Sequence, residues 1–124
     1  MTLAMAGSNA QIAETLSQSG VDLLAAGCPA EAVETFRKAI DADPLHYEAY
    51  HGLVRALRDA GQLEQSIAAA LALTALTPND PLAHTALSIS LQQAGQVPEA
   101  EAAAARARVL EWKIQLQSPP DKDL

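Results

Sequence analysis

Glycine and proline recur in this chain at a fixed step of 34 residues. Gly27, Gly61 and Gly95 are separated by that step, and Pro44 and Pro78 keep it too. A period of this length is typical of repeat proteins, in which each unit is one helical hairpin that stacks on its neighbours to bury its apolar face. The spacing therefore indicates a surface of stacked helices rather than a pocket built for catalysis.

The composition limits what such a stack can bury. The chain has 124 residues, enough for one domain with a modest core. Hydrophobic residues make up 49% of it, but aromatic residues only 3%. Because aromatic side chains normally supply large blocks of buried area, we expect a core of Leu, Ile, Val and closely packed Ala.

The net charge of −7 disfavours two classes of partner. Nucleic acid and anionic membrane surfaces both require clustered Lys and Arg, so we expect neither as a partner. Cys28 is the only cysteine, which excludes a disulfide within one chain. No run of 18 apolar residues predicts a membrane span, and the first residues lack the basic region of a signal peptide. We expect a cytoplasmic protein.

Glycine and proline divide the chain into six predicted helices. A glycine just after a helix and a proline in its first turn are the usual asymmetry of helix ends, and the residue before a proline is pushed out of the helical region. Between these breakers, apolar residues recur at helical spacing. The predicted helices cover about residues 8–26, 29–42, 45–60, 63–76, 81–94 and 97–117.

The last predicted helix is longer than the others. The repeat step places a proline at position 112, but Trp112 stands there, and the next breaker is Pro119. We expect a single repeat domain over residues 9–117, with units at about 13–46, 47–80 and 81–114. Residues 1–8 and 118–124 are predicted to be flexible termini.

The connections between the predicted helices are two to four residues long. Helices joined so tightly are antiparallel neighbours, and six of them give three hairpins in a right-handed stack. No alternating run of β-branched residues predicts a strand. The sequence therefore predicts an all-α solenoid.

The residues at fixed places of the unit resemble the tetratricopeptide repeat family, whose unit has 34 residues. The second and third units match less well than the first: Ser66 replaces the usual alanine, His84 a large apolar residue, and Ala70 and Ala104 an aromatic one. The match in the first unit is carried by Leu16, Gly20, Leu23, Ala32, Phe36, Ala39 and Pro44.

The resemblance implies a superhelix whose concave groove is lined by the first helix of each pair. It also implies a function: docking a peptide or protein segment as an adaptor, scaffold or assembly factor, without catalysis and without a cofactor. The family's groove positions fall on Glu14, Ser17, Val21, Leu24, Glu48, His51, Arg55, Arg58, Leu82, Thr85, Ile89 and Gln92. The residues that we expect to bind a partner are Val21, Leu24, His51, Arg55, Arg58, Ile89 and Gln92.

Two arginines at these positions point to an acidic ligand. Arg55 and Arg58 are one helical turn apart, and two guanidinium groups can hold a carboxylate beside the apolar residues of the groove. The alternative is that Arg58 pairs with Glu48 or Asp59 while Arg55 is solvated. The partner is therefore expected to be an acidic or apolar segment.

One activity of the family is not expected here. Some members bind the acidic C-terminus of heat-shock chaperones through a clamp of Lys, Asn and Arg. The matching positions in this chain are Ser17, Val21, Gly52, Leu82 and Ala86, none of which can hold a carboxylate.

The last helix carries apolar residues that no following unit covers. Val109, Trp112 and Leu116 lie along one line of it, with Leu110 and Ile114 beside them. Three interpretations stay open: the helix caps the stack itself, it associates with a second copy in a homodimer, or it docks a different partner.

The chain offers little that predicts chemistry. His46, His51 and His84 are its only histidines, and His51 and His84 are almost one unit apart, so that their rings could lie close. Packed or solvated histidines are commoner than ligands, and we predict no metal site. No nucleophile triad, phosphate loop or HExxH spacing occurs, so that no catalytic residue is expected.

Overall fold

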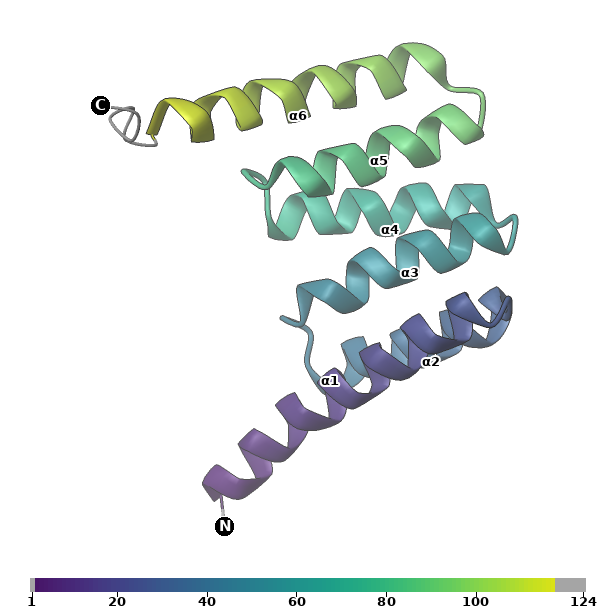
Figure 1. The fold of residues 1–124 in the computed structure, drawn as a ribbon, viewed down its shortest axis with the longest axis vertical. Coiled ribbons are helices and arrows are strands. Elements are labelled where there is room, and N and C mark those ends of the chain that lie inside the picture. Colours follow the sequence, from purple (N-terminus) through teal and green to yellow (C-terminus); the bar gives the residue numbers. More distant parts are fainter. Residues whose placement is uncertain (1, 118–124) are drawn as a thin grey trace.

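The computed structural model describes residues 2–117, with side chains from residue 9 onward. In this part of the chain it consists of six helices stacked one after another, without a strand (Figure 1). The predicted all-α class is confirmed. The helices are α1 (Thr2–Ala25), α2 (Pro29–Ala42), α3 (Tyr47–Asp59), α4 (Leu63–Leu76), α5 (Pro81–Gln93) and α6 (Val97–Gln117).

The helices form two layers. Each helix packs against the next along the chain, and α1, α3 and α5 also contact one another in that order. In the opposite layer α2 and α4 do not pack directly on one another: a cavity of about 520 Å³ lined by α2, α3 and α4 lies there, bridged by a hydrogen bond of 3.3 Å from Arg37 Nη2 to Gln65 Oε1. The layer of α1, α3 and α5 is the one that carries the predicted binding residues.

The three periodic glycines end α1, α3 and α5. Gly27, Gly61 and Gly95 have φ values of +79°, +79° and +82°, which residues with a Cβ rarely adopt. At the end of α1, the N–H of Gly27 donates to Leu24 O at 3.1 Å and that of Cys28 to Leu23 O at 2.9 Å. The same pair of hydrogen bonds recurs after α3 and α5 and satisfies the last carbonyls of each helix.

Two helix starts differ from the prediction. Residues 2–8, expected to be a flexible terminus, belong to α1, because Leu, Ala and Met are good helix formers and no proline interrupts them. The α3 helix begins at Tyr47 rather than Leu45, because the carboxylate of Asp43 accepts the N–H of Leu45 at 3.1 Å and holds it in the turn. The long α6 ends at Gln117 as expected. Residues 118–124 lie outside the described part.

The core of the first units is built around Phe36. Its ring is fully buried between Gly20 of α1 and Gly52 of α3. A Cβ at Gly20 would lie 2.6 Å from the tip of the ring, and one at Gly52 closer still. Both glycines are therefore required by the close approach of the ring.

The next core is built from smaller residues and buried hydroxyl groups. Ala70, Val54 and Leu87 are buried together. Ser66 Oγ donates to the carbonyl oxygen of Val54 at 3.1 Å and lies 2.6 Å from Ser90 Oγ. Because these buried hydroxyls have partners, they escape the cost of an unsatisfied polar group. The serine at position 66, unusual for the family, is thus accommodated by hydrogen bonding between α3, α4 and α5.

Candidate binding groove

A hollow of about 600 Å³ lies between α1 and α3. The residues that line it recur three or four positions apart on each helix, so that they share one face. The α1 helix contributes the apolar residues of the lining together with Glu14, Ser17 and Gln18, and α3 contributes mainly polar and charged side chains. The lining includes Glu14, Val21 and Leu24 from α1 and Glu48, His51 and Arg55 from α3.

The structure brings together four of the seven residues expected to bind a partner, namely Val21, Leu24, His51 and Arg55. The other three lie outside this hollow. Arg58 is half-buried one turn further along α3, while Ile89 and Gln92 are exposed on α5.

Several lining residues were missing from the expected set. Glu14 and Glu48 occupy groove positions of the repeat, 34 residues apart, and that register is a signal in the sequence. Gly52 also lines the hollow. The sequence places Gly52 at a position of the family's clamp but does not predict its close approach to Phe36.

The charges of α3 are separated along the groove. Glu48 stands in its first turn, whereas Arg55 and Arg58 stand near its end. At 1.5 Å per residue, Glu48 and Arg58 are about 15 Å apart along the helix axis. With Glu14 beside Glu48, the groove has an acidic end and a basic end, with Val21 and Leu24 on the facing helix.

The basic end has more positive than negative charge. Arg55 Nε forms an ion pair with Asp59 Oδ2 at 3.4 Å, one turn along the helix. The guanidinium of Arg58 forms no hydrogen bond or ion pair with the described residues. The alternative pairing, with Arg58 bound and Arg55 solvated, is therefore wrong. Burial lowers the pKa of Arg58, and so does the charge of Arg55, while Asp59 opposes them. An anion placed here would relieve the repulsion between the two arginines.

His51 stands between the two charged ends. Burial lowers its pKa below the usual 6.5, although Asp80 and Glu48 act in the opposite direction. The neutral imidazole is therefore the main form at pH 7, and it offers one hydrogen-bond donor and one acceptor to a ligand.

The histidines do not meet as the sequence suggested. His51 lines the groove, whereas His84 lines a hollow with Ile67 and Leu71 of α4, and its Nε2 lies 2.8 Å from the carbonyl oxygen of Pro78. The idea that the His51 and His84 rings lie close is not supported. It is instead His46 that gathers other titratable groups, Glu14 and Glu48.

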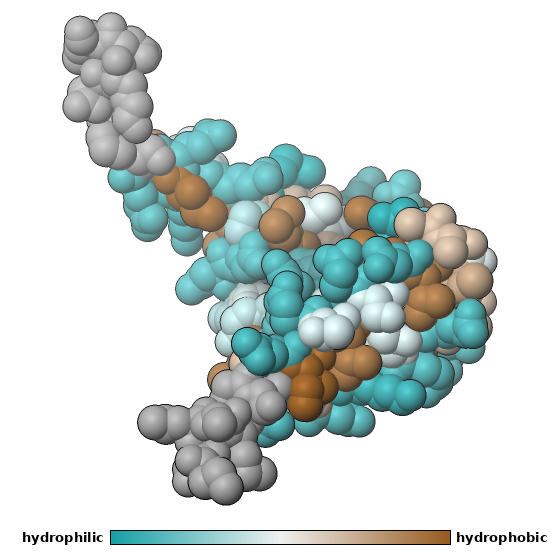
Figure 2. Space-filling view, turned by 60° about the horizontal axis from the view of Figure 1, so that its bottom comes forward, coloured by the Kyte–Doolittle hydropathy of each residue, from teal (hydrophilic) through white to brown (hydrophobic). Residues whose placement is uncertain are grey.

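The last helix presents apolar surface. Leu110 is buried, while Val109, Trp112 and Leu116 are 42%, 59% and 64% exposed. Figure 2 shows apolar atoms on the C-terminal part of α6, next to the residues drawn in grey. This line of α6 is therefore open in the single chain.

None of the helices in the described residues combines the length and the hydropathy that crossing a membrane requires.

Comparison with known proteins agrees with the repeat architecture. The family model of the tetratricopeptide repeat matches residues 23–90. No curated protein matches the chain.

Solved structures share the fold at low sequence identity. A structure of MamA is 23% identical with a TM-score of 0.74 and covers 82% of this chain, which spans only 58% of the MamA chain. The second such repeat domain of Spaghetti (RPAP3), bound to the HSP90 peptide SRMEEVD, is 17% identical with a TM-score of 0.77, covering 88% of this chain and 95% of its own. The type III secretion translocator chaperone SycD of Yersinia enterocolitica, in an alternative dimer, is 19% identical with a TM-score of 0.76, covering 91% and 83%.

Proposed function

The chain belongs to the tetratricopeptide repeat family, and on that premise we propose that it binds a peptide or protein segment in the groove between α1 and α3. In this role it acts as an adaptor or assembly factor and not as an enzyme. The observation that carries the proposal is the groove itself, a hollow of about 600 Å³ with an apolar wall and two oppositely charged ends.

The distribution of charge along the groove indicates the chemistry of the ligand. An acidic side chain or a C-terminal carboxylate suits the end with Arg55 and Arg58, where Asp59 is the one described acidic group that pairs with either arginine. An apolar side chain of the ligand can pack against Val21 and Leu24. A basic side chain suits the opposite end, where Glu14 and Glu48 lie.

The peptide-bound structure of Spaghetti supports this mode of binding for the fold. The chemistry of the ligand must differ from an acidic chaperone C-terminus held by the family's clamp. The corresponding positions here, which include Ser17, Gly52 and Ala86, carry no cationic side chain. In this chain the cationic side chains stand instead at Arg55 and Arg58.

Reversing the charge at the basic end of the groove tests the proposal. The double variant Arg55→Glu with Arg58→Glu is expected to weaken binding of a peptide with a C-terminal pair of glutamates at least tenfold, because attraction becomes repulsion. Fluorescence anisotropy with the labelled peptide measures the change. Recovery of native partners by affinity capture and mass spectrometry should fall in parallel.

The matched control reverses Arg106 and Arg108 to glutamate. Both are exposed on α6, and the net charge changes by the same amount. Circular dichroism should show equal helicity in both variants. Equal weakening of the peptide in both, or unchanged binding in the groove variant, would contradict the proposal.

A second function rests on the exposed line of α6. Val109, Trp112 and Leu116 form an apolar strip that a second copy of the chain would cover, giving a homodimer. We expect such a dimer to be lost on Trp112→Asp, since burying a carboxylate in an apolar interface is costly. Light scattering during size exclusion at micromolar concentration measures it. Leu71→Asp, at an exposed leucine of α4, is the control, and a monomeric parent protein would refute this function.

A further inference from the structure

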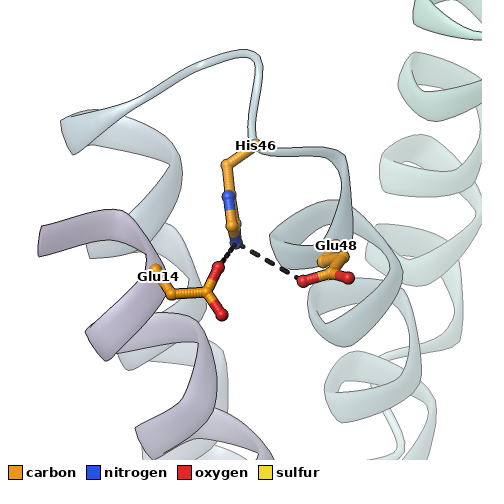
Figure 3. A group of neighbouring side chains, drawn as sticks. All are labelled: Glu14, His46 and Glu48. Carbon is orange, nitrogen blue, oxygen red and sulfur yellow. Dashed lines mark ion pairs between the residues drawn. The ribbon is translucent and has the colours of Figure 1, made fainter. Parts of the chain in front are cut away.

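We propose that Glu14, His46 and Glu48 form a site for one divalent transition-metal ion at the acidic end of the groove. Glu14 comes from the middle of α1, Glu48 from the first turn of α3, and His46 directly precedes α3. One potential ligand atom from each of the three lies within 4.8 Å of the other two. In Figure 3 the imidazole points down between the two helices and both carboxylates face its Nε2.

The imidazole nitrogen of His46 has no hydrogen-bond partner among the described residues. This nitrogen, Nε2, is buried. The nearest carboxylate oxygens, of Glu14 and Glu48, are at 3.7 and 3.8 Å, beyond hydrogen-bond distance. Leaving a buried polar atom without a hydrogen bond destabilises the folded state. A cation between the three groups would satisfy the nitrogen and neutralise both carboxylates.

The geometry is close to that of a coordinated ion. Two ligands that are each about 2.1 Å from a tetrahedral zinc ion are about 3.4 Å from one another. The observed separations of 3.7 and 3.8 Å exceed this by a few tenths of an ångström. The His46 side chain is only 15% exposed and therefore held in place, while those of Glu14 and Glu48 are 67% and 80% exposed. Small rotations of the two free carboxylates would complete the site.

The donor set selects the kind of metal. One imidazole nitrogen and two carboxylate oxygens suit zinc and the neighbouring transition metals, whereas Mg²⁺ and Ca²⁺ prefer oxygen donors alone. Three protein ligands leave a coordination position open. Since Glu14 and Glu48 also line the groove, that position lies at the end of the groove. The ion would also join α1 to α3, which belong to different repeats.

Zinc binding by the full chain, without an affinity tag, tests the site. Isothermal titration with zinc chloride at pH 7 should give one ion per chain. His46→Gln and Glu48→Gln should each weaken that binding at least tenfold. Glu48 is exposed, so its substitution leaves folding intact, and magnesium chloride should give no comparable binding.

Other donors serve as controls. His84→Gln and Cys28→Ser remove an imidazole and a thiol elsewhere and should leave the zinc affinity unchanged. Absence of stoichiometric zinc binding would overturn the site. Equal affinity in wild type and His46→Gln would overturn it as well. Because no peptide is used, these outcomes are independent of the proposed docking function.

Discussion

Replacing Phe36 with alanine is expected to lower the free energy of unfolding by about 4 kcal/mol. Phe36 is the only phenylalanine of the chain and is fully buried. The neighbouring helices present Gly20 and Gly52 to it, so that no side chain there can move into the space left behind. For a small domain with a total stability of about 5–15 kcal/mol, this is a large share.

Urea denaturation followed by circular dichroism measures this loss. The control is Leu71→Ala, which truncates a large apolar side chain that is 52% exposed and should change stability by less than about 0.5 kcal/mol. A loss below about 1 kcal/mol for the Phe36 variant would show that the ring does not fill the core in the way described.

The second large effect is expected for Gly52→Ala, with a loss of about 3 kcal/mol. Alanine in a helix is normally favoured over glycine by about 1 kcal/mol, so that a simple propensity argument predicts the opposite sign. Here the added Cβ would meet the Phe36 ring, which is already held on its other side by Gly20. Overpacking of this kind typically costs about 1–3 kcal/mol, and occasionally more.

A double-mutant cycle isolates the clash. In a Phe36→Leu background the smaller side chain should remove most of the overlap, and Gly52→Ala should become nearly neutral or slightly stabilising. Chemical denaturation of the four proteins gives the coupling energy. If Gly52→Ala destabilises both backgrounds equally, contact with the ring is not the cause.

Much of the fold can be predicted from the sequence because glycine and proline mark the helix ends for steric reasons. Gly27, Gly61 and Gly95 are needed at positive φ, and this requirement placed three helix ends correctly. The start of α1 was misplaced because the residues before Ser8 lack a periodic apolar face, although they are good helix formers. A periodic apolar face indicates a helix that packs against others, and a first turn that extends beyond the stack can form without such a face.

The candidate site could be predicted only in part. Val21, Leu24, His51 and Arg55 could be named because the repeat register fixes which side of a helix faces the groove. The cluster around His46 could not, because His46 belongs to a connection between helices. The helical period does not predict the direction of a side chain in a connection.

The Phe36 contact has a counterpart one repeat later. The positions 34 residues after Gly20, Phe36 and Gly52 are Val54, Ala70 and Ala86. Val54 and Ala70 are buried in one cluster, and Ala86 packs against it. A large ring between two glycines has thus been exchanged for a small methyl group between larger neighbours, at similar total volume.

Because of this exchange, the repeat units of the chain cannot replace one another. Placing the third unit directly after the first would press the aromatic ring against the methyl group of Ala86, and repeating the second unit would leave Ala70 opposite Gly52 with a void between them. The length of this array is therefore not freely adjustable by recombination, and a designer who wished to extend it would have to recode both sides of each junction together.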